Sequence, residues 1–263
     1  MVHTTSDGGI AISILGPLSA NIDLTGVNFG VSASLDVVTD YPFGDFLDIT
    51  VSSTASSPFN LYIRIPTWAT QANVSLNGSE PMRAQNGTFF MVTVPPTAMI
   101  HVELNPDIYI DSVGVLYNGA VSIHRGALTY GLSLGESVNV TDSHECPSPD
   151  HPQILDYEIN STSAWNIALI LDPTRPLSQY LNFSRSAAVN MSQPFDHANP
   201  PLQITAMARL IPSWGLVHGS ADAPPSSPAC TQPGSCSETP FQVSFVPFGS
   251  QHLRMSVLPW TIE

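Results

Sequence analysis

The sequence is poor in positive charge. It has no lysine, and seven arginines stand against 21 acidic residues, for a formal net charge of −14. Nucleic-acid binding depends on Lys and Arg side chains that neutralise phosphates, and the sequence contains no basic run. Anionic membrane surfaces attract proteins through the same side chains. We therefore expect neither nucleic acid nor a membrane as a partner.

The sequence also lacks any apolar segment near the roughly 20 residues that a membrane-spanning helix needs. Its start, MVHTTSDGGI, has neither the basic nor the apolar region of a secretory signal peptide. Seven N-x-S/T acceptor sites for N-glycosylation are nevertheless present, and such sites are used only in a chain that enters the secretory route. We expect an extracellular protein that is missing its true N-terminus. The acceptor residues are Asn73, Asn77, Asn86, Asn139, Asn160, Asn182 and Asn190.

Cysteine is scarce, with three residues in the chain. Cys230 and Cys236 lie in SSPACTQPGSC, a loop rich in Pro, Gly and Ser in which a short ring closes easily. We predict a disulfide between them, which again favours an oxidising compartment. Cys146 is left over, and it is either buried or paired with a partner outside this chain.

Helical periodicity is missing as well. Short stretches of alternating apolar and polar residues end at Pro, Gly or Asn-Gly, and this pattern predicts an all-β protein. The clearest example is the segment 58–78, PFNLYIRIPTWATQANVSLNG. A strand should end at Pro66, the alternation resumes over 72–76, and Asn77-Gly78 favours a type I′ turn, so we expect a central hairpin here. Further strands are predicted at 10–14, 32–38, 46–51, 89–94 and 101–104.

The stretch 105–119 contains Pro and Gly but no sustained alternation, and we interpret it as the joint between two domains. The predicted architecture is two tandem antiparallel β-sandwiches of jelly-roll type, 1–110 and 111–263. In the second domain we expect one long strand from Val121 to Leu134, interrupted at Gly126. A loop over 135–152 and a long Pro-rich loop over 213–238 are also expected. The other predicted strands are 157–159, 165–171, 202–210, 241–248 and 253–258.

Several segments resemble one known family in their order and spacing. They are YPFGDFLDITV, LYIRIPTWATQANVSLNG, HRGALTYGLSLGE, WNIALILDP, LIPSWGL and FVPFGSQHLRMSVLPW. The most specific are R-I-P-x-W at Arg64 to Trp68 and R-G-A-L-x-Y at Arg125 to Tyr130. The family is glycoside hydrolase family 127 (GH127), the β-L-arabinofuranosidases, and the resemblance covers nearly the whole chain.

In that family an (α/α)₆ barrel carries the catalytic apparatus, including a zinc-bound cysteine nucleophile, and two β-sandwich domains follow it. The resemblance falls on the sandwiches alone, and Thr5 to Ile14 is similar to the stretch just after the barrel. The sequence has no Cys-Cys pair that would match the barrel motifs. We therefore assign no catalytic residue, metal ligand or cofactor to this chain. The resemblance implies carbohydrate as a partner, and a catalytic barrel supplied in cis or in trans.

Two groups of residues could carry chemistry of their own. His144, Cys146 and His151 lie with carboxylates in HECPSPDH, but their spacing matches no regular zinc site and the prolines restrict how they converge, which favours a solvated loop. Glycosidases need two carboxylates about 5 to 10 Å apart. Asp45 with Asp48, or Glu136 with Asp142, could supply such a pair. Each of these residues lies beside a turn, where acidic side chains commonly form hydrogen bonds to the local backbone. Their presence is therefore explained without a catalytic role.

Three residues are candidates for contact with carbohydrate. Trp68 and Trp214 lie just beyond predicted strand ends, where an aromatic ring either stacks on a sugar or fills a gap in the packing. Packing is the interpretation that we favour for each. Arg64 lies within a strand in a chain with few cations, and we expect it to pair with a carboxylate, with contact to a sugar as the second interpretation.

Our leading hypothesis from the sequence is the non-catalytic β-sandwich portion of a secreted GH127-like glycoside hydrolase, inactive by itself. The parent activity would be hydrolysis of β-L-arabinofuranosides or related plant cell-wall glycans. The alternative is a free-standing carbohydrate-binding or cell-wall-associated module. A third hypothesis is an enzyme that uses the 144–151 cluster.

Overall fold

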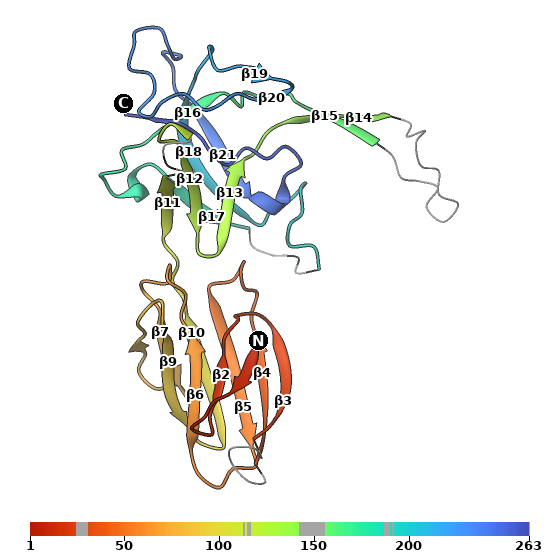
Figure 1. Cartoon of the computed structure of the whole chain (residues 1–263), viewed down its shortest axis with the longest axis vertical. Coiled ribbons are helices and arrows are strands. Elements are labelled where there is room, and N and C mark those ends of the chain that lie inside the picture. The colour runs from red at the N-terminus through yellow and green to blue at the C-terminus, as the bar shows by residue number, and fades with distance from the viewer. Residues whose placement is uncertain are drawn as a thin grey trace. The chain divides into compact units, whose positions relative to one another are not determined.

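The computed structural model describes residues 1–24, 31–112, 114, 117–141, 156–186, 190 and 192–262. Within these ranges the regular structure consists of β-strands and short 3₁₀-helices, with no α-helix (Figure 1). The prediction of an all-β protein is confirmed. In the same ranges no helix is long and apolar enough to cross a membrane.

The chain divides into two compact units, Met1–Asp107 and Ile108–Glu263. We had placed Ile108 to Ile110 in the first domain. These residues instead begin β11 (Ile108–Ser112), which pairs with β12 (Val121–Arg125) along its whole length and so belongs to unit 2.

Unit 1 contains two sheets. One sheet has the order β1 (Val2–Thr4), β2 (Ile10–Ile12), β6 (Phe59–Arg64) and β9 (Phe89–Val94). The other has the order β3 (Leu18–Asp23), β4 (Ser32–Val38), β5 (Phe46–Ser53), β10 (Thr97–Glu103), β7 (Asn73–Leu76) and β8 (Met82–Arg83). All these neighbours are antiparallel except β2 and β6, which run parallel and depart from the purely antiparallel prediction.

The two sheets of unit 1 share one hydrophobic core. Alternate residues of each long strand are buried, as the period of two along a strand requires. Leu61 and Ile63 of β6 are fully buried, and they belong to the same cluster as Ile49 and Val51 of β5 in the other sheet. The sheets therefore pack face to face as a sandwich.

The segment 58–78 crosses from one sheet to the other instead of forming a hairpin. β6 pairs with β2 and β9, whereas β7 pairs with β10 and β8. Pro66 has no N–H to continue the ladder of β6, so the chain leaves that sheet there. Asn77 and Gly78 do have the positive φ angles of a type I′ turn, 51° and 74°. The strands and the turn are present, and the turn leads from β7 into its antiparallel neighbour β8. The hairpin therefore lies between β7 and β8 and not between β6 and β7.

The loop that precedes β2 is fastened to β6 by one carboxylate. Asp7 accepts hydrogen bonds from Asn60 Nδ2 at 2.8 Å and from the Tyr62 hydroxyl at 2.7 Å. Together with the Thr5 hydroxyl, these donors hold the pKa of Asp7 well below its usual range. Gly9 follows in this loop, and a side chain there would meet the Asn60 carbonyl oxygen at 2.4 Å. This close approach explains the glycine.

Unit 2 is built on one eight-stranded sheet. Its order is β11, β12, β13 (Leu128–Leu132), β21 (Phe241–Pro247), β18 (Leu202–Leu210), β16 (Ile167–Ile170) and β22 (Trp260–Thr261), and β17 (Asn182–Arg185) pairs with β18 beside this path. β16 and β22 are parallel. Two hairpins complete the unit: β14 (Glu136–Thr141) with β15 (Asp156–Ser161), and β19 (Leu216–Val217) with β20 (Ser220–Ala221).

Three details of unit 2 differ from the sequence prediction. The expected single strand from Val121 to Leu134 is a hairpin, β12 with β13, because Gly126 has a φ of 59° and reverses the chain. The expected loop over 135–152 begins with β14. The expected strand over 253–258 forms only an isolated bridge between Val121 and Leu258. Pro259 follows directly and cannot donate to a ladder.

The shared core of unit 1 makes a direct prediction. The substitution Ile63→Ala removes a fully buried side chain from the middle of β6 and should lower the free energy of unfolding by about 2–5 kcal/mol. Urea denaturation followed by tryptophan fluorescence measures the change. Met99→Ala is the control, because Met99 is 65% exposed on β10. This substitution should change the free energy of unfolding by less than about 0.5 kcal/mol. Equal effects of the two substitutions would contradict the assignment of the core.

Candidate functional site

The contact candidates of unit 1 lie at and just beyond the end of β6. Trp68 is half-buried against the core of unit 1 and stacks on Tyr41, with ring centroids 6.5 Å apart and ring planes at 10°. Arg64 is exposed. The carboxylate partner that we expected for Arg64 is absent from the part of the chain that the structure describes. Trp68 therefore remains the aromatic candidate of this unit.

Trp214 is a packing residue. It is only 4% exposed and meets Trp165 edge to face, with ring centroids 5.3 Å apart. Its Nε1 donates a hydrogen bond to the Asp222 carbonyl oxygen at 2.9 Å. The ring is not available to stack on a sugar at the surface, so packing is the interpretation of Trp214 that the structure supports.

The Pro-rich loop 213–238 is held down at several points. It contains the β19–β20 hairpin and the Cys230–Cys236 disulfide. The guanidinium of Arg209 on β18 donates to the carbonyl oxygens of Ser237, at 2.9 Å, and Glu238. Cys146 and the whole 144–151 cluster lie outside the described residues.

The carboxylate pairs considered from sequence have other partners. Asp48 lies on β5, and its Oδ1 is 2.6 Å from Nδ1 of His101 on the neighbouring β10. Asp45 lies just before β5, where its carbonyl oxygen accepts a hydrogen bond from the Leu104 amide at 2.8 Å. Asp142, the expected partner of Glu136, lies outside the described residues. Glu136 is instead the centre of a cluster that the sequence did not reveal.

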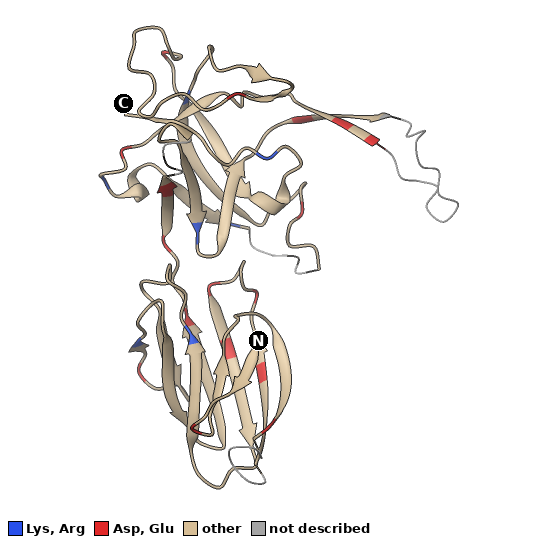
Figure 2. Ribbon diagram, viewed as in Figure 1, with Lys and Arg blue, Asp and Glu red and all other residues tan. Residues whose placement is uncertain are grey.

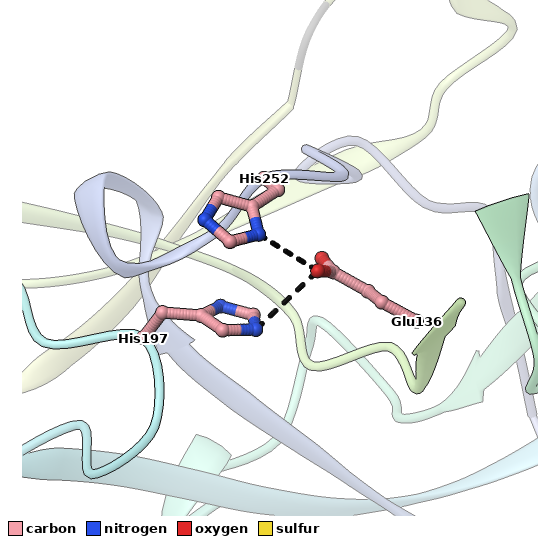
Figure 3. Close-up of side chains that lie close together, drawn as sticks. All are labelled: Glu136, His197 and His252. Carbon is pink, nitrogen blue, oxygen red and sulfur yellow. Dashed lines mark hydrogen bonds and ion pairs between the residues drawn. The ribbon is translucent and has the colours of Figure 1, made fainter. Parts of the chain in front are cut away.

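Two histidines from distant segments converge on the Glu136 carboxylate (Figure 3). Glu136 is the first residue of β14, His197 precedes β18, and His252 follows β21. His252 Nδ1 is 2.8 Å, and His197 Nε2 is 3.3 Å, from Glu136 Oε2. The Leu253 amide donates to the other carboxylate oxygen at 3.2 Å. The two imidazole rings stack, with centroids 4.1 Å apart.

Burial and charge act in opposite directions on this carboxylate. The Glu136 side chain is 7% exposed, whereas those of His197 and His252 are 44% and 50% exposed. Burial raises the pKa of Glu136. The hydrogen bonds from His252 and the Leu253 amide, together with the charges of the two histidines, lower the pKa by more, so the net direction is downward. Glu136 is therefore ionised at neutral pH.

No local motif could have predicted this cluster. His252 is separated from Glu136 by 116 positions, and neither histidine lies in a ligand pattern of regular spacing. The alternation around each residue is also weak, since His197 and His252 lie in segments between strands. A tertiary structure was required to bring the three side chains together.

All seven acceptor asparagines are described, and none of them is buried. Asn73 and Asn86 are half-buried, and the other five are exposed. Figure 2 shows the basic residues as isolated positions, with acidic residues on both units. The described surface thus shows no cluster of basic residues for a polyanion.

Comparison with known families assigns unit 1. Residues 9–107 match the family model described as beta-L-arabinofuranosidase, GH127 middle domain. Unit 1 is thus similar over nearly its whole length to the middle domain of GH127 enzymes. The resemblance to GH127 is confirmed over these residues. The sequence matches none of the curated proteins.

Solved GH127 structures share the fold of the whole chain. Ara127N-Se, a GH127 β-L-arabinofuranosidase from Geobacillus stearothermophilus T6, is 15% identical in sequence and superimposes with a TM-score of 0.58; the match covers 100% of this chain and 34% of Ara127N-Se. The GH127 β-arabinofuranosidase BT3674 is 14% identical with a TM-score of 0.56, and the match covers 97% of this chain and 35% of BT3674. A protein described as a glycoside hydrolase is 16% identical with a TM-score of 0.59, and the match covers 98% of this chain and 36% of that protein. This chain spans about a third of the length of each.

The assignment of Trp214 to packing can be tested by substitution. Trp214→Ala should lower the free energy of unfolding of unit 2 by about 3–5 kcal/mol, because it removes a buried ring. Trp214→Phe keeps an aromatic ring but removes the N–H that donates to the Asp222 carbonyl oxygen. This variant should lower the free energy of unfolding by about 1 kcal/mol. Chemical denaturation monitored by circular dichroism measures both. Leu216→Ala, at a site that is 59% exposed in the same loop, is the neutral control. A Trp214→Ala protein as stable as the control would contradict the assignment.

Proposed function

We propose that this chain is the non-catalytic β-sandwich portion of a GH127-like glycoside hydrolase that acts on β-L-arabinofuranosides or related plant cell-wall glycans. The observation that carries the proposal is the match of unit 1 to the GH127 middle domain. Three glycoside hydrolase structures also support the proposal, because this chain matches only about a third of the length of each. In this role the two units act with a helical catalytic domain, in cis or in trans, and the bound carbohydrate is the substrate of that domain.

The described surface chemistry fits a non-catalytic role. Of the carboxylates considered from sequence, Asp48 is bound by His101 on the adjacent strand, and Glu136 is bound by two histidines and the Leu253 amide. Glycoside hydrolysis needs two carboxyl groups that face one substrate, one of them free to act as an acid. Glu136 is ionised and its lowered pKa is the opposite of what a general acid requires. The chain by itself is expected to be inactive.

We place this protein outside the cell. The Cys230–Cys236 disulfide is compatible with an oxidising compartment, and the seven acceptor asparagines are at least partly accessible for glycosylation. Glycans at Asn139 and Asn160 would both lie on the β14–β15 hairpin, and each residue is exposed there.

An immunoblot of culture fluid and cells from the native source, combined with an activity assay, tests the proposal. We expect a secreted band that remains well above 28.1 kDa after enzymatic deglycosylation, and hydrolysis of an aryl β-L-arabinofuranoside by that protein. The chain purified alone should leave the same substrate intact. A deglycosylated band at 28.1 kDa, or hydrolysis by the purified chain, would contradict the proposal.

A free-standing carbohydrate-binding module is the second candidate function, and the stacked pair of Trp68 and Tyr41 favours it. Two nearly parallel rings at a partly exposed position can form a platform for a sugar ring. Affinity electrophoresis in arabinan-containing gels tests this function. Binding predicts retardation of the chain that Trp68→Ala abolishes and Met99→Ala, an exposed substitution on the same unit, leaves unchanged. Equal mobility with and without arabinan would exclude it.

A further inference from the structure

The cluster of Glu136, His197 and His252 has the composition of a metal site. Two imidazoles and one carboxylate are ligands that Zn²⁺ binds, and a site with three protein ligands retains a position for water. One ligand atom from each residue lies within 4.8 Å of the others. Ligand atoms around a tetrahedral ion with bonds of about 2.0–2.1 Å lie ~3.3 Å apart. The separation from Glu136 Oε2 to His197 Nε2 is 3.3 Å, and that to His252 Nδ1 is shorter, 2.8 Å.

The hydrogen bond on the far side of His197 fixes which nitrogen faces the carboxylate. His197 Nδ1 is 3.0 Å from the Ser250 carbonyl oxygen, which only accepts, so Nδ1 carries the proton. In the neutral ring Nε2 then presents a lone pair to the carboxylate at 3.3 Å. A metal-bound histidine has the same arrangement, with the nitrogen that does not bind the metal donating to a backbone carbonyl.

A small cavity supplies the second, independent observation. It has a volume of about 20 Å³, adjoins Glu136 and His197, and is lined in addition by Ser250 and Gln251. These two residues are 2% and 5% exposed, and the Ser250 hydroxyl and Gln251 Oε1 have no hydrogen-bond partner among the described residues. Buried polar atoms normally have partners, and a polar cavity of this size holds about one water. The cavity, which Glu136 and His197 line and His252 does not, thus has room for one non-protein group beside the carboxylate.

We propose that Glu136, His197 and His252 bind one divalent transition-metal ion, with Zn²⁺ the best match to the donor set. The ion joins the start of β14 to the segments that precede β18 and follow β21. Its role is structural, because it links β14, which lies outside the eight-stranded sheet, to the segments that flank β18 and β21 of that sheet. Binding of the ion adds its free energy to the stability of the folded unit.

Isothermal titration calorimetry of the untagged, EDTA-treated chain with ZnCl₂ at pH 7.5 tests the proposal. We expect one ion per chain, a lower melting temperature in EDTA than in Zn²⁺, and visible d–d absorption of the Co²⁺-loaded protein. His252→Gln changes a ligand that is 50% exposed, so the variant should fold, and Glu136→Gln changes the shared carboxylate. Each should weaken Zn²⁺ binding by at least about 10-fold and abolish the thermal shift.

Two controls separate this site from other sources of binding. His218→Gln removes an exposed histidine of unit 2 outside the cluster, and Cys146→Ser removes the thiol of HECPSPDH. Both should retain one ion at unchanged affinity. The proposal is overturned if His252→Gln binds as tightly as the unchanged chain, if Cys146→Ser is the variant that loses the ion, or if the unchanged chain takes up no Zn²⁺. In the last case the three residues form a hydrogen-bonded ion pair only.

Discussion

The burial of one face of every long strand against the opposite sheet is the constraint on which unit 1 depends. Strands β4, β5 and β6 each bury alternate residues almost completely, and these side chains meet in one core. The two faces can meet only if the chain passes from one sheet to the other. It does so after Ile65, where Pro66 ends the ladder of β6 and the chain continues to β7 in the second sheet. This proline-containing segment is one of several crossings that close the sandwich.

The scarcity of cations shapes the electrostatics of both units. In the described ranges histidines take the place that Lys and Arg usually hold beside carboxylates: His101 is paired with Asp48, His124 with Asp111, and two histidines with Glu136. Several arginines serve other purposes. Arg209 holds backbone carbonyl oxygens, and Arg125 lies over the Phe183 ring at 3.9 Å.

Local alternation was sufficient to predict most strands of unit 1, because each buries one face and so repeats with a period of two. It predicted β4 at its observed bounds and β9 likewise. It did not predict which strands pair. The distinction between a hairpin and a crossing at 58–78 depends on long-range partners, β2 and β9 for one strand and β10 for the other. The same limit explains the single strand expected from Val121 to Leu134, where the reversal at Gly126 gives two strands of the same sheet.

The candidate site was less predictable than the fold for a related reason. Aromatic residues near strand ends look alike in sequence whether they are buried, as Trp214 is, or partly exposed, as Trp68 is. The distinction depends on what packs over the ring. His197 and His252 carry no local signal at all, since their significance comes from a carboxylate on another segment. Resemblance to a family did identify unit 1, because motifs such as R-I-P-x-W preserve local packing that periodicity alone does not specify.

The cluster on Glu136 lies where unit 2 has little regular structure. The segments that carry His197 and His252 contain little regular structure, so few ladder hydrogen bonds hold them. Two histidines that meet at one carboxylate replace those bonds with a single tertiary link at the base of the β14–β15 hairpin. An ion shared by all three would strengthen that link at one point, without any requirement for substrate access. Such a site contributes to the stability of unit 2.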